Sequence, residues 1–322
     1  MLLRVRRNVL SVVLRIAVSV VLAVGLVAGT ASVAGASGER QDPQQTPQFQ
    51  ASADVTSIIV PVTVRDGKGR IVTTLEQKDF RLHIDALEVP VSSFWREGGL
   101  ALSLALVIDV SGSMAGRRLA KTLEAVNEIL RLLRPDDEIC IITFGGGEVK
   151  RRLKFEGDRS MTQRIVGSLQ GYGTTALYDM LSAAPQVMEG ARNIRRAALL
   201  FTDGVDTASS MSPDQAVAVL QNLADPLYAI GIEPPPDDEG PPDAYEELLR
   251  RFAAASGGRY LRVDDAARLP VFARELRQEL GMRYILAFQT SGAGMVKWRK
   301  LEVGVPPGLA AQARHGYVGT LP

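Results

Sequence analysis

The sequence predicts an α/β fold, a doubly wound and mostly parallel sheet, flanked by a small β module that both chain ends build. In residues 99–280, apolar runs such as "LSLALVID", "EICIITF" and "AALLFTD" alternate with helical stretches. Strands that are apolar almost throughout are buried on both faces, as in parallel sheets covered by helices. The flanking segments 54–98 and 281–322 instead alternate apolar and polar residues, which is typical of half-buried strands.

Residues 1–36 have the layout of an export signal. Four arginines and no acid precede an apolar stretch of about a dozen residues, and "VAGA" ends at Ala36 as an A-x-A cleavage site would. An uncleaved membrane anchor at 16–36 stays open as the alternative, because Gly and Ala residues could extend the span. Either way the folded part is expected outside the cytoplasm, periplasmic, cell-surface or secreted. Residues 37–53, polar and rich in Gln and Pro, predict a flexible linker.

The N-terminal β segment, 54–98, begins with "VTSIIVPVTVRD", a "DGKG" turn signal and "RIVTTL", which together predict a hairpin. "DFRLHIDALEVPVSSF" predicts two more strands. So few residues cannot bury a two-sided core alone. We therefore expect the tail strands "RYILAFQTS" and "KWRKLEVGVP" to complete this module, with Trp95 and Trp298 in its core.

Within the central domain, "RRLAKTLEAVNEILRLLRP" and "SPDQAVAVLQNL" have the clearest helical period. Ser212 followed by Pro213 marks the start of the second helix. "EVKRRLKF" (148–155) alternates, so it predicts an edge hairpin with the preceding strand, turned by "GGG" at 145–147.

Three polar clusters follow strands of this sheet, where open α/β sheets bind ligands. The first is Asp109, Ser111 and Ser113; the second is the loop "GYGTTALYDML"; the third is "TDG", with Asp203 at the strand end. They supply carboxylate and hydroxyl oxygens and nothing softer. That donor set suits a hard divalent cation that keeps some water, Mg²⁺ above all.

The D-x-S-x-S motif, the "GTTALYD" threonine and the "TDG" aspartate resemble, in this order, the metal-ion-dependent adhesion site of von Willebrand factor type A domains. The resemblance implies that Ser111 and Ser113 bind Mg²⁺, Mn²⁺ or Ca²⁺ directly, and Thr175 directly or through water. Asp109 and Asp203 would hold coordinating waters or enter the first shell. Thr175 is chosen over Thr174 because it directly precedes "ALYD".

The flanks are similar to those of exported proteins with this domain that are typical of Acidobacteria. The resemblance rests on the export signal, on "VTVRDGKGRIVTTLEQKDF" and on the tail "AAQARHGYVG". Ala86 follows "HID" where that family usually has Gly, which puts the expected tight turn in doubt.

Other interpretations of these residues compete with the metal site. The D-x-S-x-S motif could be a helix cap, which would leave Thr175 and Asp203 unexplained. Asp179 and Asp206 are expected to be helix or loop residues, and "EPPPDDEGPPDAYEE" (233–247) a solvated loop. The chain's two histidines, His83 and His315, are too far apart in the sequence to indicate zinc.

The expected function is an exported, metal-dependent adhesion module rather than an enzyme. An Asp or Glu carboxylate of a partner protein would complete the coordination of the cation. The cation stays electrophilic because its hydroxyl ligands are neutral. The alternative is a metal-dependent hydrolase or phosphotransferase, which needs a nucleophile or base nearby. No suitable His is found, and Cys140 lies within an apolar strand. A net charge of +1 with interleaved signs excludes an extended nucleic-acid surface.

Overall fold

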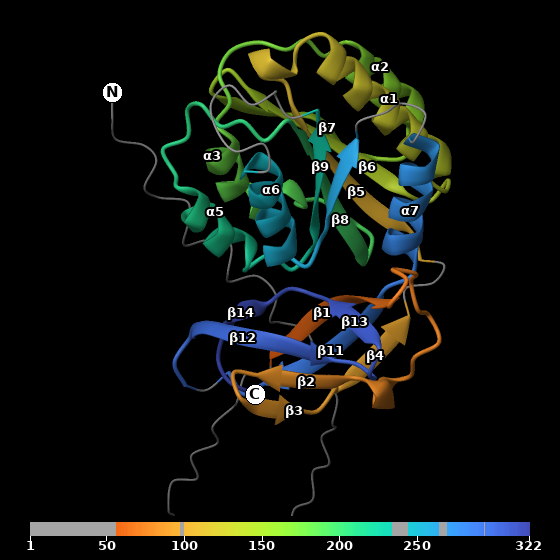
Figure 1. The fold of residues 1–322 in the computed structure, drawn as a ribbon, viewed down its shortest axis with the longest axis vertical. Coiled ribbons are helices and arrows are strands. Elements are labelled where there is room, and N and C mark those ends of the chain that lie inside the picture. The colour runs from red at the N-terminus through yellow and green to blue at the C-terminus, as the bar shows by residue number, and fades with distance from the viewer. Residues whose placement is uncertain (1–55, 97–99, 234–243, 264–268, 293) are drawn as a thin grey trace, which may run out of the picture. The chain divides into compact units, whose positions relative to one another are not determined.

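The structure is a computed structural model that describes most of the chain after the expected linker (Figure 1). The described residues are 56–96, 100–233, 244–263, 269–292 and 294–322. The expected export signal or anchor, 1–36, and the linker, 37–53, lie outside them. In the described part, every helix is too short or too polar to cross a membrane.

The central sheet has the strand order β10-β9-β8-β5-β6-β7. Its strands are β5 (Leu102–Asp109), β6 (Glu138–Gly145), β7 (Glu148–Glu156), β8 (Arg195–Thr202), β9 (Leu227–Ile232) and β10 (Tyr260–Val263). All neighbouring pairs are parallel except β6 and β7, which form an antiparallel edge hairpin. The doubly wound, mostly parallel sheet predicted from the sequence is confirmed.

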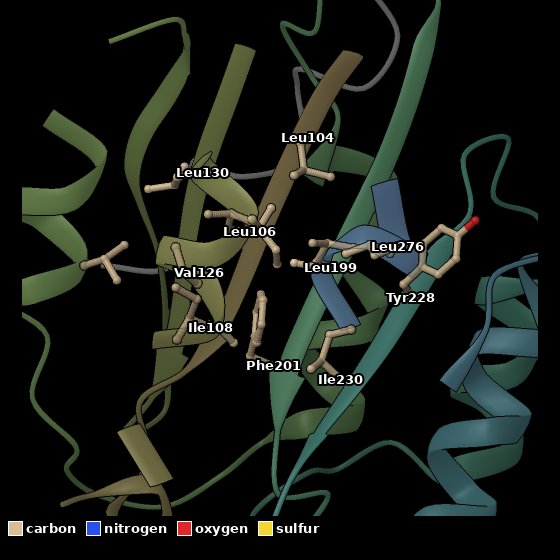
Figure 2. Close-up of a cluster of buried hydrophobic side chains, with 14 of the residues drawn as sticks. Leu104, Leu106, Ile108, Val126, Leu130, Leu199, Phe201, Tyr228, Ile230 and Leu276 are labelled. Carbon is tan, nitrogen blue, oxygen red and sulfur yellow. The ribbon is translucent and has the colours of Figure 1, made fainter. Parts of the chain in front are cut away.

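Helices cover both faces of this sheet. They are α1 (Arg117–Leu132), α2 (Arg159–Gly167), α3 (Leu177–Ser182), α4 (Ala184–Val187), α5 (Pro213–Leu220), α6 (Ala244–Ala255) and α7 (Leu269–Gly281). Helices α1, α2 and α7 pack on one face, around the cluster shown in Figure 2 with Leu106, Phe201 and Leu276. Helices α3 to α6 pack on the other face, around Val107, Leu200 and Phe252.

The apolar strands lie in the middle of this sandwich of layers. Every residue of β5 and of β6 is buried, as the continuous apolar runs predicted. Helix α1 buries Leu119, Val126 and Leu130 on one stripe, which gives it an amphipathic contact with the sheet. The tip of β5 is therefore held in place by packing on both sides.

Two four-stranded antiparallel sheets form the flanking β module, in the orders β13-β1-β11-β4 and β14-β12-β2-β3. Their strands are β1 (Thr56–Asp66), β2 (Arg81–Ile84), β3 (Leu87–Val89), β4 (Ser93–Arg96), β11 (Tyr284–Thr290), β12 (Lys297–Gly304), β13 (Leu309–Gln312) and β14 (Gly316–Gly319). Short 3-10 helices are η1 (Gln77–Asp79) and η2 (Gly112–Met114). N-terminal strands pair with C-terminal ones, β1 with β11 and β13, and β2 with β12. Both chain ends thus build one module around a shared apolar core.

Three local expectations for the flanks and loops are wrong. "RIVTTL" adds only an isolated bridge, Arg65 to Ile71, instead of a hairpin strand. The segment 79–94 contains three strands rather than two, and residues from Ala244 onward begin α6 rather than continue a loop. Periodicity over a few residues does not determine whether a neighbouring strand is in reach to pair with.

The two tryptophans are not in the core of the β module. Trp95 is 51% exposed and Trp298 is 40% exposed. On β4 the inward position belongs to Phe94, whose ring centroid lies 5.8 Å from that of Tyr284. On β12 the flanking residues Arg299 and Leu301 are buried instead. Successive side chains along a strand point to opposite faces of the sheet. Because the residue next to each tryptophan faces the core, the tryptophan faces outward.

The tight turn put in doubt by Ala86 does form. Ile84 pairs directly with Leu87, leaving a two-residue turn between β2 and β3. Asp85 takes the left-handed conformation, at φ 55°, that a glycine would otherwise favour. Its carboxylate accepts a 3.0 Å hydrogen bond from the Lys300 backbone N–H and pairs with Arg299 at 3.1 Å. These contacts with β12 stabilise the turn without glycine.

Candidate metal centre

Asp109 is the last residue of β5 and lies at the carboxyl end of the central sheet. It is completely buried. One carboxylate oxygen, Oδ1, accepts a 2.9 Å hydrogen bond from the Ser111 backbone N–H, and Oδ2 accepts a 2.7 Å bond from the Thr202 hydroxyl. The parallel register of β5 and β8 brings Thr202 beside it. Both bonds fix the orientation of this carboxylate.

Ser111 and Ser113 lie at the start of the loop that links β5 to α1. Their hydroxyl oxygens are 3.1 Å apart. Ser111 is buried, whereas Ser113 is exposed, so the pair leads from the sheet edge to solvent. The short 3-10 helix η2 turns the chain tightly enough to bring both hydroxyls to one side.

Backbone contacts hold the loop before Thr175 against the first loop. The Gly112 N–H donates to the Gly173 carbonyl at 2.9 Å, and the Tyr172 N–H donates to the Val110 carbonyl at 2.8 Å. Gly173 has a φ of +71°, and a Cβ there would lie 2.6 Å from the Gly146 Cα. Glycine is required because the two backbones approach too closely for a side chain.

Thr175 is 2% exposed. Its carbonyl accepts hydrogen bonds from the backbone N–H groups of Thr207 and Ala208, both at 2.9 Å. Its own N–H donates to the Thr207 hydroxyl at 2.9 Å. Thr175 is therefore held by the loop after β8, and its connection to Asp109 and the serines runs through the backbone.

Asp203 directly follows β8 and is completely buried. Its Oδ1 accepts a 3.1 Å hydrogen bond from the Val205 N–H. Its Oδ2 is buried and has no hydrogen-bond donor among the described residues; the nearest cation is Arg118, with Nη1 at 3.5 Å. At this distance the two groups form an ion pair but no hydrogen bond. A carboxylate oxygen buried in this way lacks one partner.

Asp179 and Asp206 serve the loops rather than the cluster of oxygen donors. Asp206 accepts a 2.7 Å hydrogen bond from the Leu177 N–H at the start of α3. Asp179 accepts bonds from the backbone N–H groups of Ser210, at 3.0 Å, and Met211, at 2.8 Å. Together they fix the loop after β8 against α3.

The two buried carboxylates influence one another. Burial, and to a smaller extent the nearby charge of Asp203, raises the pKa of Asp109 to about 6, although the hydrogen bonds from Ser111 and Thr202 lower it. Two carboxylates that share a buried edge repel each other. A cation placed between them and the hydroxyls would remove this repulsion.

The donor set fits a hard divalent cation. Among the described residues, Asp203 Oδ2 is an acceptor without a donor, and the serine hydroxyls supply neutral oxygens beside Asp109. Such oxygens are the ligands of Mg²⁺, Mn²⁺ and Ca²⁺. The described part of the chain contains no group of three or more His, Cys, Asp or Glu side chains that could hold a metal ion. A site here would thus depend on its hydroxyl ligands.

Two residues beside these oxygens were not identified from the sequence. Thr202 precedes Asp203 at the end of β8. Had β5 and β8 been recognised as neighbouring parallel strands, their register would have placed Thr202 beside Asp109. Arg118 lies in the first turn of α1 and donates a 2.7 Å hydrogen bond to the Ser113 carbonyl. Its sequence position, among ordinary helix residues, carries no such signal.

Residues 104–217 match the family model of the von Willebrand factor type A domain. The region similar to known proteins therefore includes Asp109, Ser111, Ser113, Thr175 and Asp203. The α/β fold with a mostly parallel sheet is the fold expected from the sequence resemblance.

Curated relatives include inter-alpha-trypsin inhibitor heavy chains. The heavy chain H3 of Pongo abelii is 29% identical over 143 residues, which are 40% of this chain and 16% of that protein. The heavy chain H4 of Sus scrofa is 25% identical over 194 residues, 55% of this chain and 20% of that protein. The chain thus matches a fifth or less of their length.

Among solved structures, a von Willebrand factor type A protein from Catenulispora acidiphila is similar. It is 15% identical and has a TM-score of 0.47; the match covers 76% of this chain and 74% of that one.

Proposed function

We propose that the von Willebrand factor type A domain in this chain is a metal-dependent protein-binding module. A divalent cation, Mg²⁺ or alternatively Mn²⁺ or Ca²⁺, would be held by Asp109, Ser111, Ser113, Thr175 and Asp203. An Asp or Glu carboxylate of a partner protein would complete its coordination. The observation that carries the proposal is the buried Oδ2 of Asp203, an acceptor without a hydrogen-bond donor in the described residues, at the same sheet edge as two adjoining serine hydroxyls.

The direction of approach follows from the burial of the five residues. Asp109, Ser111, Thr175 and Asp203 are buried, and Ser113 alone is exposed. A partner would therefore reach the cation from the side of Ser113. The ligands on the protein side include three neutral hydroxyls, so a bound cation would keep a strong attraction for an incoming carboxylate.

A hydrolase that uses the same cation finds less support in the described residues. Such an enzyme needs a nucleophile or a general base near the reacting group. The two histidines of the chain lie in the β module, His83 in β2 and His315 just before β14. Cys140 is buried within β6, where burial raises the pKa of its thiol to about 11. Binding is therefore the preferred function.

Export belongs to the same proposal. It rests on the layout of residues 1–36 and would place the module outside the cytoplasm, periplasmic, secreted or on the cell surface. A partner would then be another exported or surface protein. The domain limits 54–98, 99–280 and 281–322 are proposed with it.

Thermal unfolding with and without divalent cations tests the metal site. Mg²⁺ or Mn²⁺ at about 100 times its Kd should stabilise the fold by about 2.7 kcal/mol and raise Tm accordingly. Asp203→Asn should abolish the shift. Asp214→Asn, at an exposed aspartate in α5 that pairs with Arg251, is the matched control and should keep it. An equal shift in both variants, or none in the wild type, would refute the site.

The partner is tested by capture from the extracellular or periplasmic fraction of the native cells. Retention should require Mg²⁺ or Mn²⁺, be lost with EDTA and be lost with Asp203→Asn. Release of phosphate or acetate from ester substrates, abolished by both treatments, would instead establish the hydrolase.

A further inference from the structure

Arg118 is fixed in place beside the candidate metal centre. Its Nη1 donates to the Ser113 carbonyl at 2.7 Å, and its Nε donates to the Glu233 carbonyl at 2.8 Å. These two bonds tie the first turn of α1 to the serine loop and to the end of β9. The side chain is 21% exposed, so it is not a freely rotating surface arginine.

Among the described residues, the same guanidinium is the cation nearest to Asp203. Its Nη1 lies 3.5 Å from Oδ2, the carboxylate oxygen that lacks a hydrogen-bond donor in the described residues. The Asp203 side chain is fully buried, so water screens this pair weakly. Arg118 thus partly neutralises the carboxylate that would face a divalent cation.

A divalent cation at Asp203 Oδ2 would lie close to this positive charge. Both cations would be attracted by the same carboxylate and would repel each other at short range in a poorly screened environment. Because two carbonyl groups hold the guanidinium, it cannot move away without losing hydrogen bonds.

We infer that Arg118 is a built-in counter-ion of Asp203 that competes with the divalent cation and so lowers the metal affinity of the site. In the metal-free protein, Arg118 limits the cost of burying Asp203. Metal binding proceeds against its charge. The inference rests on the proposed metal site and assigns to Arg118 a role in setting its affinity.

A purely structural role makes the opposite prediction. If Arg118 only holds the serine loop through the Ser113 carbonyl, its removal would displace Ser113 and weaken metal binding. The two roles are therefore separated by the sign of the change in Kd.

The test is a titration of the full chain with Mn²⁺, in which the electron paramagnetic resonance signal reports free Mn²⁺. Arg118→Gln removes the charge and keeps an N–H donor for the Ser113 carbonyl; it should bind Mn²⁺ about tenfold more tightly. Arg118→Lys keeps the charge and should remain within about threefold of the wild type.

Arg117→Gln is the matched control. Arg117 is the preceding residue of α1, its side chain is 78% exposed and it pairs with the Glu233 carboxylate at 3.3 Å. Removing this charge should leave the Mn²⁺ affinity within about twofold of the wild type, because solvent screens it. An equal gain in Arg117→Gln and Arg118→Gln would show a general charge effect and overturn the inference.

Thermal unfolding gives a second measurement. Without metal, Arg118→Gln should have a lower Tm than the wild type, because Asp203 loses its counter-ion. With saturating Mn²⁺ the Tm values of the two proteins should become closer, so the metal-induced rise in Tm is larger in the variant. Unchanged or weaker Mn²⁺ binding by Arg118→Gln would overturn the inference while leaving the proposed function intact. If no protein binds Mn²⁺, both fail.

Discussion

The hydroxyl of Thr202 donates a 2.7 Å hydrogen bond to Oδ2 of Asp109, joining the carboxyl ends of β8 and β5. Both residues are completely buried. The Thr202 oxygen also accepts a 3.1 Å bond from the Gly204 N–H, so one hydroxyl links the end of β5, which carries Asp109, to the loop that carries Asp203. The candidate centre thus depends on a residue that is not itself among the five expected ligands.

Thr202→Val should destabilise the metal-free protein by about 1–3 kcal/mol, because Asp109 Oδ2 and the Gly204 N–H lose their partner in a buried place. Urea unfolding in EDTA measures this. Thr162→Val is the control: Thr162 is equally buried in α2, and its hydroxyl makes only a 3.3 Å bond to the Asp158 carbonyl. Equal losses in the two variants would contradict a special role for Thr202.

Gly173→Ala should disrupt the loop that carries Thr175. A left-handed φ costs a side chain about 1–2 kcal/mol, and the added Cβ would also lie 2.6 Å from the Gly146 Cα. Gly147→Ala is the control, since Gly147 has a φ of +75° with open space around its Cβ position. We expect Gly173→Ala to lower Tm more and to weaken the Mn²⁺ response selectively. Identical Tm values would show that the close approach has no cost.

Glu279→Gln should destabilise the contact of α7 with the β module. The Glu279 side chain is fully buried and pairs with Arg65 of β1 and, at 2.8 Å, with Arg259. Both arginines are partly exposed, so the expected loss is about 1–3 kcal/mol, below that of a fully buried pair. Glu275→Gln, at an exposed position of the same helix, should change the unfolding free energy by less than about 0.5 kcal/mol. Comparable effects would argue against the buried network.

Cys140 should resist thiol reagents in the native protein. Burial raises the pKa of its thiol from 9.0 to about 11, and only the thiolate reacts. Since the unfolded chain ionises first, stability should fall as pH rises between about 9 and 11. Reaction with a disulfide reagent at pH 8 should be complete in denaturant and negligible without it. Rapid native labelling would disprove the burial; the chain has only this cysteine, so the signal is unambiguous.

The sequence predicted the α/β core well because its signals are local. An uninterrupted apolar run such as 104–108 is compatible with few environments other than a strand covered on both faces, and the structure buries all of it. Period-two alternation likewise predicted that both chain ends form antiparallel sheets, as β1 and β11 do. The same rule was too weak for single residues, since it did not show which way Trp95 and Trp298 would face.

The five residues of the candidate site were predicted from local patterns in the sequence: Asp109, Ser111 and Ser113 close one apolar run, Asp203 closes another, and Thr175 stands in a Gly-rich loop. The structure places Thr175 between α2 and α3 rather than at a strand end. How these residues are supported depends on contacts between elements, which the sequence did not reveal. The Thr202 hydroxyl donates to Asp109 across a strand pair, although the two residues are 93 positions apart in the sequence. Arg118 approaches Asp203 from a helix. Hydrophobic periodicity reflects burial along one element, whereas hydrogen bonds and charges act between elements, through distances that folding alone establishes.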